Sequence, residues 1–183
     1  MSLRRAVFLD RDGVLNRVFI RGGVPCPPAT LDELELVPDA PELLQRLHRA
    51  GFLLLLVTNQ PDVGRGLQSC ELVEEIHARL RAELPLDDLF VCYHGGHEQP
   101  PCACRKPLPG LLLEAAGRHG VDLASSFVIG DRWRDIDAGA AAGCRTLWID
   151  HGYAERRPAH PAGARVATLA EAVDCILRYT DSS

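Results

Sequence analysis

Short hydrophobic runs alternate with amphipathic stretches along the chain. Five runs are continuously apolar, as strands buried on both faces usually are, and they cover residues 6–9, 52–57, 89–92, 127–129 and 146–149. The stretches between them carry helical spacing or helix-favouring composition, which predicts helices over 38–50, 69–83, 111–119, 135–142 and 168–179. This alternation predicts an α/β fold, a doubly wound Rossmann-like parallel sheet with helices on both faces.

Local signals mark the ends of the predicted helices, and three long stretches carry no such pattern. Asp39 is the candidate N-cap of the 38–50 helix, and Gly51 ends it. The irregular stretches are 16–36, the Cys-rich and Pro-rich segment 94–109, and 152–165. Long loops in a compact domain are usually functional or tied down. We expect a single domain over 1–183, with no large second domain inserted into it.

Composition limits the classes of partner. The 183 residues are 46% hydrophobic and 25% charged with a net charge of −5, an ordinary globular balance that does not favour nucleic acid or anionic lipid. The longest apolar run, 52–57, is far shorter than the ~20 residues of a membrane span. The first residues lack the apolar segment of a signal peptide. We therefore expect a cytoplasmic monomer without membrane or nucleic-acid partners.

Acidic residues follow two of the predicted strands. Asp10-Arg11-Asp12 comes after the first strand, and Gly130-Asp131 follows the fourth. The carboxyl ends of parallel strands are where ligands bind in such sheets, so these acids should share one pocket. A hard cation such as Mg²⁺, which prefers oxygen ligands and keeps room for a substrate phosphate, would relieve their repulsion. The plainer alternative, that Asp10 and Asp131 only cap the next segments, explains one such acid better than two.

Three further residues could contribute to a phosphate site. Lys106 lies just before a predicted helix, where its charge would offset that of a carboxylate nucleophile and a phosphate. Thr58, at the end of the second strand, offers a hydroxyl donor, and Asn59 beside it offers an amide. Taken alone, a pair such as Arg105-Lys106 is usually solvated, and a threonine such as Thr58 is common at the end of a strand.

The cysteines point to a second metal. The chain has seven, an odd number with uneven spacing, which argues against a disulfide framework in a chain without a signal peptide. Three of them crowd with a histidine into thirteen residues, which indicates a metal site: Cys92, His94, Cys102 and Cys104. His97 is a competing ligand. The other four cysteines fit small buried hydrophobic positions.

Taken together, these motifs resemble the haloacid dehalogenase (HAD) superfamily. The matching segments are Asp10-Arg11-Asp12-Gly13-Val14-Leu15-Asn16, Thr58-Asn59-Gln60, Arg105-Lys106-Pro107 and Gly130-Asp131-Arg132 with Asp135. Their order spans about residues 6 to 150, and the combination is specific although each piece is weak. The chain looks like the small phosphatases of the heptose 1,7-bisphosphate and histidinol-phosphate type, because it also carries Cys92-Tyr93-His94 and Cys102-Ala103-Cys104.

The resemblance implies a mechanism. Asp10 would attack phosphorus to form an aspartyl-phosphate, and Asp12 would act as general acid and then as general base. Asp10, the backbone carbonyl of Asp12, and Asp131 would hold Mg²⁺. Thr58 and Lys106 would bind the transferring phosphoryl group.

The resemblance also implies roles for residues around the catalytic centre. Asn59, Gln60, Arg105 and Arg132 would face the substrate. Asp135 would orient Lys106 or a metal-bound water. Cys92, His94, Cys102 and Cys104 would form a closed structural Zn²⁺ site, with His94 preferred to His97 because it matches the family position.

Two departures from the family pattern bear on the substrate. Pro61-Asp62 stands where such phosphatases carry Ser-Gly, and the segment after Asn16 lacks Gly-Tyr-Val. We expect a small phosphorylated substrate, with the 7-phosphate of D-glycero-D-manno-heptose 1,7-bisphosphate first. Histidinol phosphate or another small phosphomonoester is the alternative within the class. A receiver-like domain, phosphorylated on aspartate without turnover, is the alternative outside it.

Overall fold

A six-stranded parallel sheet forms the centre of the molecule. The computed structural model describes residues 3–99 and 101–181, so both ends of the predicted domain 1–183 lie outside the described residues. The sheet order is β5 (Asp88–Cys92), β4 (Leu53–Asn59), β1 (Ala6–Leu9), β6 (Phe127–Gly130), β7 (Arg145–Ile149) and β8 (Ala164–Val166). All neighbouring pairs are parallel, as the apolar runs predict.

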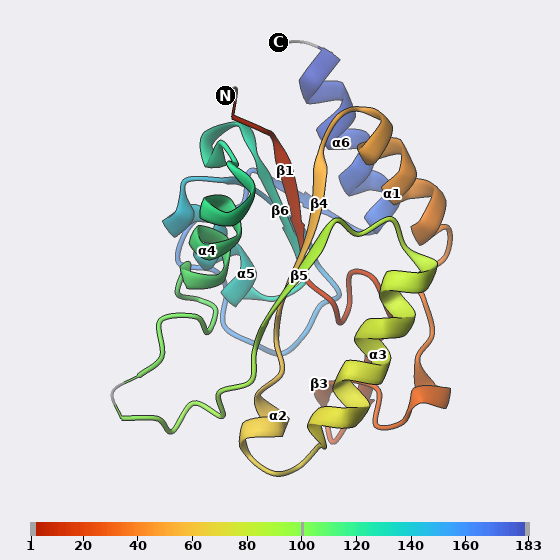
Figure 1. Cartoon of the computed structure of the whole chain (residues 1–183), viewed down its shortest axis with the longest axis vertical. Helices are drawn as coiled ribbons and strands as arrows, with labels where there is room; N and C mark the ends of the chain where they lie inside the picture. Colours follow the sequence, from red (N-terminus) through yellow and green to blue (C-terminus); the bar gives the residue numbers. More distant parts are fainter. Residues whose placement is uncertain (1–2, 100, 182–183) are drawn as a thin grey trace.

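Helices cover both faces of this sheet (Figure 1). On one face, α1 (Ala40–Arg49), α3 (Cys70–Glu83) and α6 (Leu169–Asp181) share a core with Val7 and Leu9. On the other, α4 (Gly110–His119) and α5 (Trp133–Ala142) pack with Ala6 and Phe8. Because successive strand residues point to opposite faces, a strand that is apolar at every position fills both cores. The predicted fold class is therefore confirmed.

Part of the first irregular stretch is a hairpin. The antiparallel strands β2 (Phe19–Arg21) and β3 (Val24–Cys26) are joined by Gly22-Gly23, and a 3-10 turn follows at Leu31–Glu33. Both glycines have positive φ, 58° and 80°, which only glycine adopts easily. The expectation of a structureless segment was wrong because three-residue strands with no buried face leave no apolar pattern.

Other short elements also lie where loops were expected. The last residues of 152–165 begin β8, an edge strand too short to show a period. A four-residue helix, α2 (Pro61–Gly64), follows β4, and a 3-10 turn covers Leu123–Ser125.

The start of α1 differs from the prediction. Asp39 occupies the N-cap position, but its backbone is left-handed with φ 60°, and its side chain accepts no capping hydrogen bond. Ser69 caps α3 in the ordinary way, since its hydroxyl accepts from the amide of Leu72 at 3.2 Å. Within the described residues, no helix has the length and apolar character needed to cross a membrane.

Candidate active site

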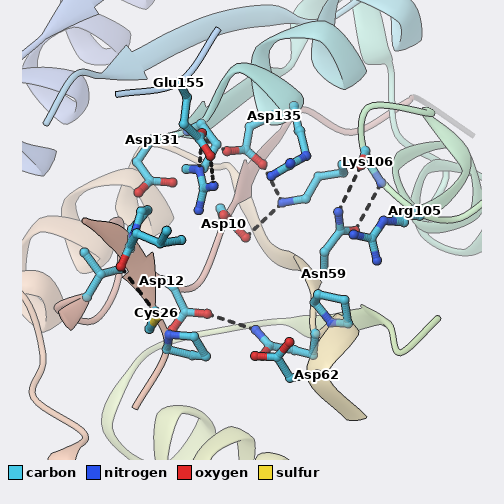
Figure 2. Close-up of a pocket in the computed structure, with 18 of the residues that line it drawn as sticks. Asp10, Asp12, Cys26, Asn59, Asp62, Arg105, Lys106, Asp131, Asp135 and Glu155 are labelled. Atoms are coloured by element: carbon cyan, nitrogen blue, oxygen red, sulfur yellow. Dashed lines mark hydrogen bonds and ion pairs between the residues drawn. The ribbon is translucent and has the colours of Figure 1, made fainter. Parts of the chain in front are cut away.

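The carboxyl ends of three strands meet at one edge of the sheet. Asp10 follows β1, Asn59 ends β4, and Asp131 follows β6. Since β1 lies between β4 and β6, the order of strands along the chain reverses here, which opens a crevice for a ligand. A cavity of about 410 Å³ occupies this place, and Asp10, Asp12 and Asp131 line it (Figure 2).

A buried lysine lies between two carboxylates at the base of the cavity. Lys106 Nζ is 2.8 Å from Asp10 Oδ1 and 2.6 Å from Asp135 Oδ1, and it donates to the carbonyl of Val57 at 2.8 Å. Its three donors are therefore all used. Burial alone would lower the pKa of Lys106, but Asp10 and Asp135 outweigh it and raise that pKa. The lysine is a permanent positive charge in this site.

Asp10 has an environment suited to a nucleophile rather than to a surface carboxylate. Burial, and then the charge of Asp135, raise the pKa of Asp10 to about 6, while Lys106 works against this shift. Asp135 holds its own place by accepting from the backbone amide of Arg132 at 3.0 Å. Its contact with Lys106 is the orienting contact expected from the sequence.

The surroundings of Asp131 suit a cation site. Both of its carboxylate oxygens are buried without a hydrogen-bond partner of ordinary geometry among the described residues, and the Tyr153 hydroxyl, which also lacks one, lies close enough to lower the pKa of Asp131. Burial, and then the charges of Asp10 and Asp135, raise the pKa of Asp131 well above its ordinary value. Gly13 makes this close packing possible: its φ is 81°, and a Cβ there would lie 2.0 Å from Asp131 Oδ2. An oxygen-rich site with two unsatisfied carboxylate oxygens fits a hard divalent cation.

Asp12 is held by several donors. Its Oδ2 accepts from Arg11 Nη2 at 2.9 Å and from Gln60 Nε2 at 2.9 Å, and its Oδ1 accepts from Asn16 Nδ2 at 2.9 Å. Burial alone would raise the pKa of Asp12, but Arg11 and then the hydrogen bonds outweigh it and lower that pKa. The carboxylate is ionised in this arrangement.

Thr58 and Gln60 lie together under the cavity. The Thr58 hydroxyl is buried and accepts from Gln60 Nε2 at 3.0 Å. Gln60 lines the cavity, but its amide is engaged with Asp12, Thr58 and Arg11. Its polar atoms are thus turned to the protein rather than held free for a substrate.

Asn59 and Arg132 line the cavity with their polar groups already partnered. Asn59 Nδ2 donates to the carbonyl of Lys106 at 3.0 Å, and the Lys106 amide donates back to Asn59 Oδ1 at 3.1 Å. This pair of bonds fixes the backbone that carries the lysine. Arg132 forms a two-point ion pair with Glu155, with Nε 2.6 Å from Oε2.

Two further arginines, Arg105 and Arg134, line the cavity. Arg105 donates to the carbonyl of His94 at 2.6 Å, and Arg134 extends from the first turn of α5. Neither guanidinium has a carboxylate partner among the described side chains. Burial, and then the charge of Arg132, lower the pKa of Arg134, while the charge of Glu155 works against this shift. Arg134 was not among the predicted residues, and its place directly before Asp135 was the available signal.

The hairpin closes one side of the cavity. Its residues Val24, Pro25 and Cys26 line the space, as does Val18 before it, and Figure 2 places Cys26 near Asp12. The stretch 16–36 therefore shapes the pocket. The stretch 152–165 reaches the same pocket through Glu155.

The four predicted zinc ligands are gathered at the end of β5. Their ligand atoms all lie within 4.8 Å of one another. Cys92 Sγ is 3.9 Å from Cys102 Sγ and 3.2 Å from Cys104 Sγ, and His94 Nδ1 is 3.2 Å from Cys104 Sγ. A Zn–S bond of ~2.3 Å in a tetrahedron implies sulfur separations of ~3.8 Å, so the donor set fits zinc. His97 is outside this cluster.

Comparisons with known proteins support the same reading. A family profile described as HAD-hydrolase-like matches residues 103–173. The D-glycero-beta-D-manno-heptose-1,7-bisphosphate 7-phosphatase of Bordetella bronchiseptica is 34% identical over 173 residues, which is 88% of this chain and 91% of the relative. The chain belongs to this family of HAD phosphatases. It is a phosphoric monoester hydrolase of that superfamily.

Further similarities extend over most of this HAD phosphatase. A Mycobacterium tuberculosis D-glycero-alpha-D-manno-heptose-1,7-bisphosphate 7-phosphatase is 36% identical, covering 78% of each chain. The crystal structure of the B. bronchiseptica D,D-heptose 1,7-bisphosphate phosphatase, complexed with magnesium and phosphate, has a TM-score of 0.80 at 32% identity and covers 96% of this chain and 99% of that one. A HAD-like phosphatase from Mesorhizobium loti has a TM-score of 0.78 at 27% identity, covering 100% and 88%.

Proposed function

We propose that this HAD phosphatase removes the 7-phosphate from D-glycero-D-manno-heptose 1,7-bisphosphate in a Mg²⁺-dependent reaction. The observation that carries the proposal is the cavity itself. Its lining includes Asp10, Asp131 and Lys106, which can bind one phosphate together with a cation, and also two arginines that have no carboxylate partner among the described side chains. A substrate with two phosphates satisfies both sets of residues. The relatives are named as phosphatases of a heptose bisphosphate, which carries two phosphates.

The magnesium site would use Asp10, Asp131 and the backbone carbonyl of Asp12. The fit rests on the two buried oxygens of Asp131, neither of which accepts a hydrogen bond of ordinary geometry from the described residues. When bound, the cation supplies charge neutralisation for the phosphate and the attacking carboxylate. Lys106, fixed by Asp135 and Asn59, supplies a second positive charge at the same place.

The chemistry divides between two aspartates. A carboxylate oxygen of Asp10 attacks phosphorus, and the bond between phosphorus and the ester oxygen breaks as that oxygen takes a proton from Asp12. A water then gives a proton to Asp12 and attacks phosphorus, which releases Asp10 and inorganic phosphate. Asp12 is ionised in the substrate-free arrangement, as the base step needs. The approach of a phosphate dianion raises the pKa of a carboxyl and so favours the acid form.

The remaining site residues have positioning or binding roles in this proposal. The hydroxyl of Thr58 and the amine of Lys106 bind the transferring phosphoryl group. Asn59 acts by fixing the Lys106 backbone, and Gln60 by holding Asp12. Arg132 faces the substrate with its charge balanced by Glu155.

Arg105 and Arg134 form the second phosphate subsite of the proposal. Each lacks a carboxylate partner among the described residues, whereas Arg65, which also lines the cavity, pairs with Asp62 at 3.3 Å. A phosphate that stays on the sugar would supply the missing counter-charge and set the distance to Asp10.

Zn²⁺ has a structural role in the proposal. Cys92, His94, Cys102 and Cys104 leave no open position for a substrate or water. The last ligand is directly followed by Arg105 and Lys106. The metal would therefore hold in place the segment that delivers both cations to the pocket.

A substrate panel tests the proposal. Initial rates of phosphate release would be measured with Mg²⁺ for both anomers of the heptose bisphosphate, for histidinol phosphate and for p-nitrophenyl phosphate, with Asp10→Asn as the blank. The proposal expects a bisphosphate anomer to have the highest kcat/KM by at least 100-fold. Faster turnover of histidinol phosphate would overturn the substrate. Stable phosphorylation of Asp10 without turnover would favour the receiver-like alternative.

A further inference from the structure

The arginine between the two motif aspartates is completely buried. Arg11 is 0% exposed, so each of its donors must find an acceptor inside the protein. Its Nε and Nη2 donate to Asp12 Oδ2 at 3.1 and 2.9 Å, and Nη2 also donates to Gln60 Oε1 at 2.9 Å. These contacts leave Nη1 to be satisfied from another element.

His77 of α3 supplies that acceptor. Its Nε2 lies 3.3 Å from Arg11 Nη1, and the histidine is 2% exposed. A guanidinium can only donate, so Nε2 must present its lone pair and the ring proton must sit on Nδ1. Nδ1 lies 3.5 Å from Glu74 Oε1 without a hydrogen bond, and the hydroxyl of Tyr93 donates to the same carboxylate. The contact with Arg11 therefore sets the tautomer of His77, and the charge of Glu74 lies on the side that carries the proton.

The consequence reaches the catalytic residues through Arg11. Arg11 orients Asp12 by two hydrogen bonds, and it fixes which end of the Gln60 amide points to Asp12 and Thr58. Loss of the Nη1 acceptor leaves a buried donor unsatisfied, which favours rotation of the guanidinium toward another partner. Asp12 and Gln60 would then lose the guanidinium that orients both side chains.

We infer that His77 is a positioning residue for the acid–base step, because its Nε2 lone pair holds Arg11 in the plane that orients Asp12 and Gln60. The inference rests on the proposed function only for the identity of Asp12 as acid and base. His77 lies on a helix that contributes no other group to the reaction, and nothing in the strand-end motifs points to it. It does not touch the cavity lining directly.

The test compares His77→Leu, which removes the acceptor, with His77→Gln, which restores an acceptor at the end of a chain of similar reach. Ile76→Val, at the neighbouring buried core position of α3, is the matched control. Steady-state kcat and KM for the heptose bisphosphate would be measured at saturating Mg²⁺, together with the melting temperature of each variant. We expect His77→Leu to lower kcat at least tenfold with KM within twofold, His77→Gln to remain within threefold of wild type, and Ile76→Val to leave both constants unchanged.

Several results would overturn the inference. Equal losses in the Leu and Gln variants would show that packing, not the lone pair, matters. A rise in KM with unchanged kcat would place the effect on binding. If His77→Leu does not fold, Glu74→Ala replaces it: this exposed change should lower kcat about threefold without moving the melting temperature, and no change in kcat would refute the network.

The same variants keep the two proposals separate. If the wild-type enzyme hydrolyses a phosphomonoester other than the heptose bisphosphate, the proposed substrate fails. The ratio of variant to wild-type kcat on that other substrate still decides whether His77 positions the acid–base step. If kcat falls for the bisphosphate in the pattern expected, both proposals stand.

Discussion

His77 should make the stability of the folded protein sensitive to mild acid. Burial, and then the charge of Arg11, lower the pKa of His77 from 6.5 to about 4. Because the unfolded chain takes up this proton more readily, neutral His77 contributes its full stability above pH 6.5, and the contribution is lost as the pH falls toward 4. The two pKa values imply that His77 lowers the free energy of unfolding by about 2 kcal/mol when the pH falls from 7 to 5.

The assay is urea unfolding of wild type and His77→Gln at a series of pH values from 7.5 to 5, with EDTA present. Glutamine does not titrate, so the difference in unfolding free energy between the two proteins isolates His77 from every other group. We expect this difference to move in favour of His77→Gln by about 2 kcal/mol on going from pH 7 to pH 5. A difference that is constant with pH, at equal m-values, would refute the argument that His77 is buried neutral against Arg11.

Three other changes should have distinct effects. Gly13→Ala, which places a Cβ against Asp131, should weaken Mg²⁺ binding at least tenfold by calorimetry; an unchanged affinity would mean that Asp131 is not a ligand. The double change Cys102→Ser and Cys104→Ser should abolish the bound zinc in a metal analysis and lower kcat at least tenfold, whereas full activity without zinc would contradict a structural role for the metal. Arg134→Ala should raise KM for the heptose bisphosphate about tenfold but leave KM for p-nitrophenyl phosphate within twofold, and equal effects on both would exclude a second phosphate subsite.

Strong local patterns made much of this protein predictable. The five apolar runs became β1, β4, β5, β6 and β7 because a strand buried on both faces needs apolar residues at every position. Once the sheet is parallel, its carboxyl edge must collect Asp10, Asn59 and Asp131, so the centre of the site follows from order alone. The gathering of Cys92, His94, Cys102 and Cys104 was predictable for a similar reason, since three thiols and an imidazole within thirteen residues have few other uses, and zinc as their ligand stays a prediction.

Contacts between residues that are distant in the sequence could not be predicted from it. Arg132 and Glu155 are 23 residues apart, and only the folded backbone makes them an ion pair. Gln60 turns to Asp12 because a buried guanidinium fixes its amide, and that guanidinium depends in turn on His77 from another helix. The hairpin over 19–26 has no buried face and therefore no hydrophobic period. The single domain, the cytoplasmic location and the monomeric state stay predictions.

The position of the phosphate that is removed tests the central claim most directly. Phosphorus NMR would follow heptose 1,7-bisphosphate with Mg²⁺ and either wild-type enzyme or Asp10→Asn. The account predicts that wild type converts the signal of the 7-phosphate to inorganic phosphate while the signal of the 1-phosphate stays, and that Asp10→Asn changes neither signal. Loss of the 1-phosphate, or release of phosphate by Asp10→Asn, would contradict it.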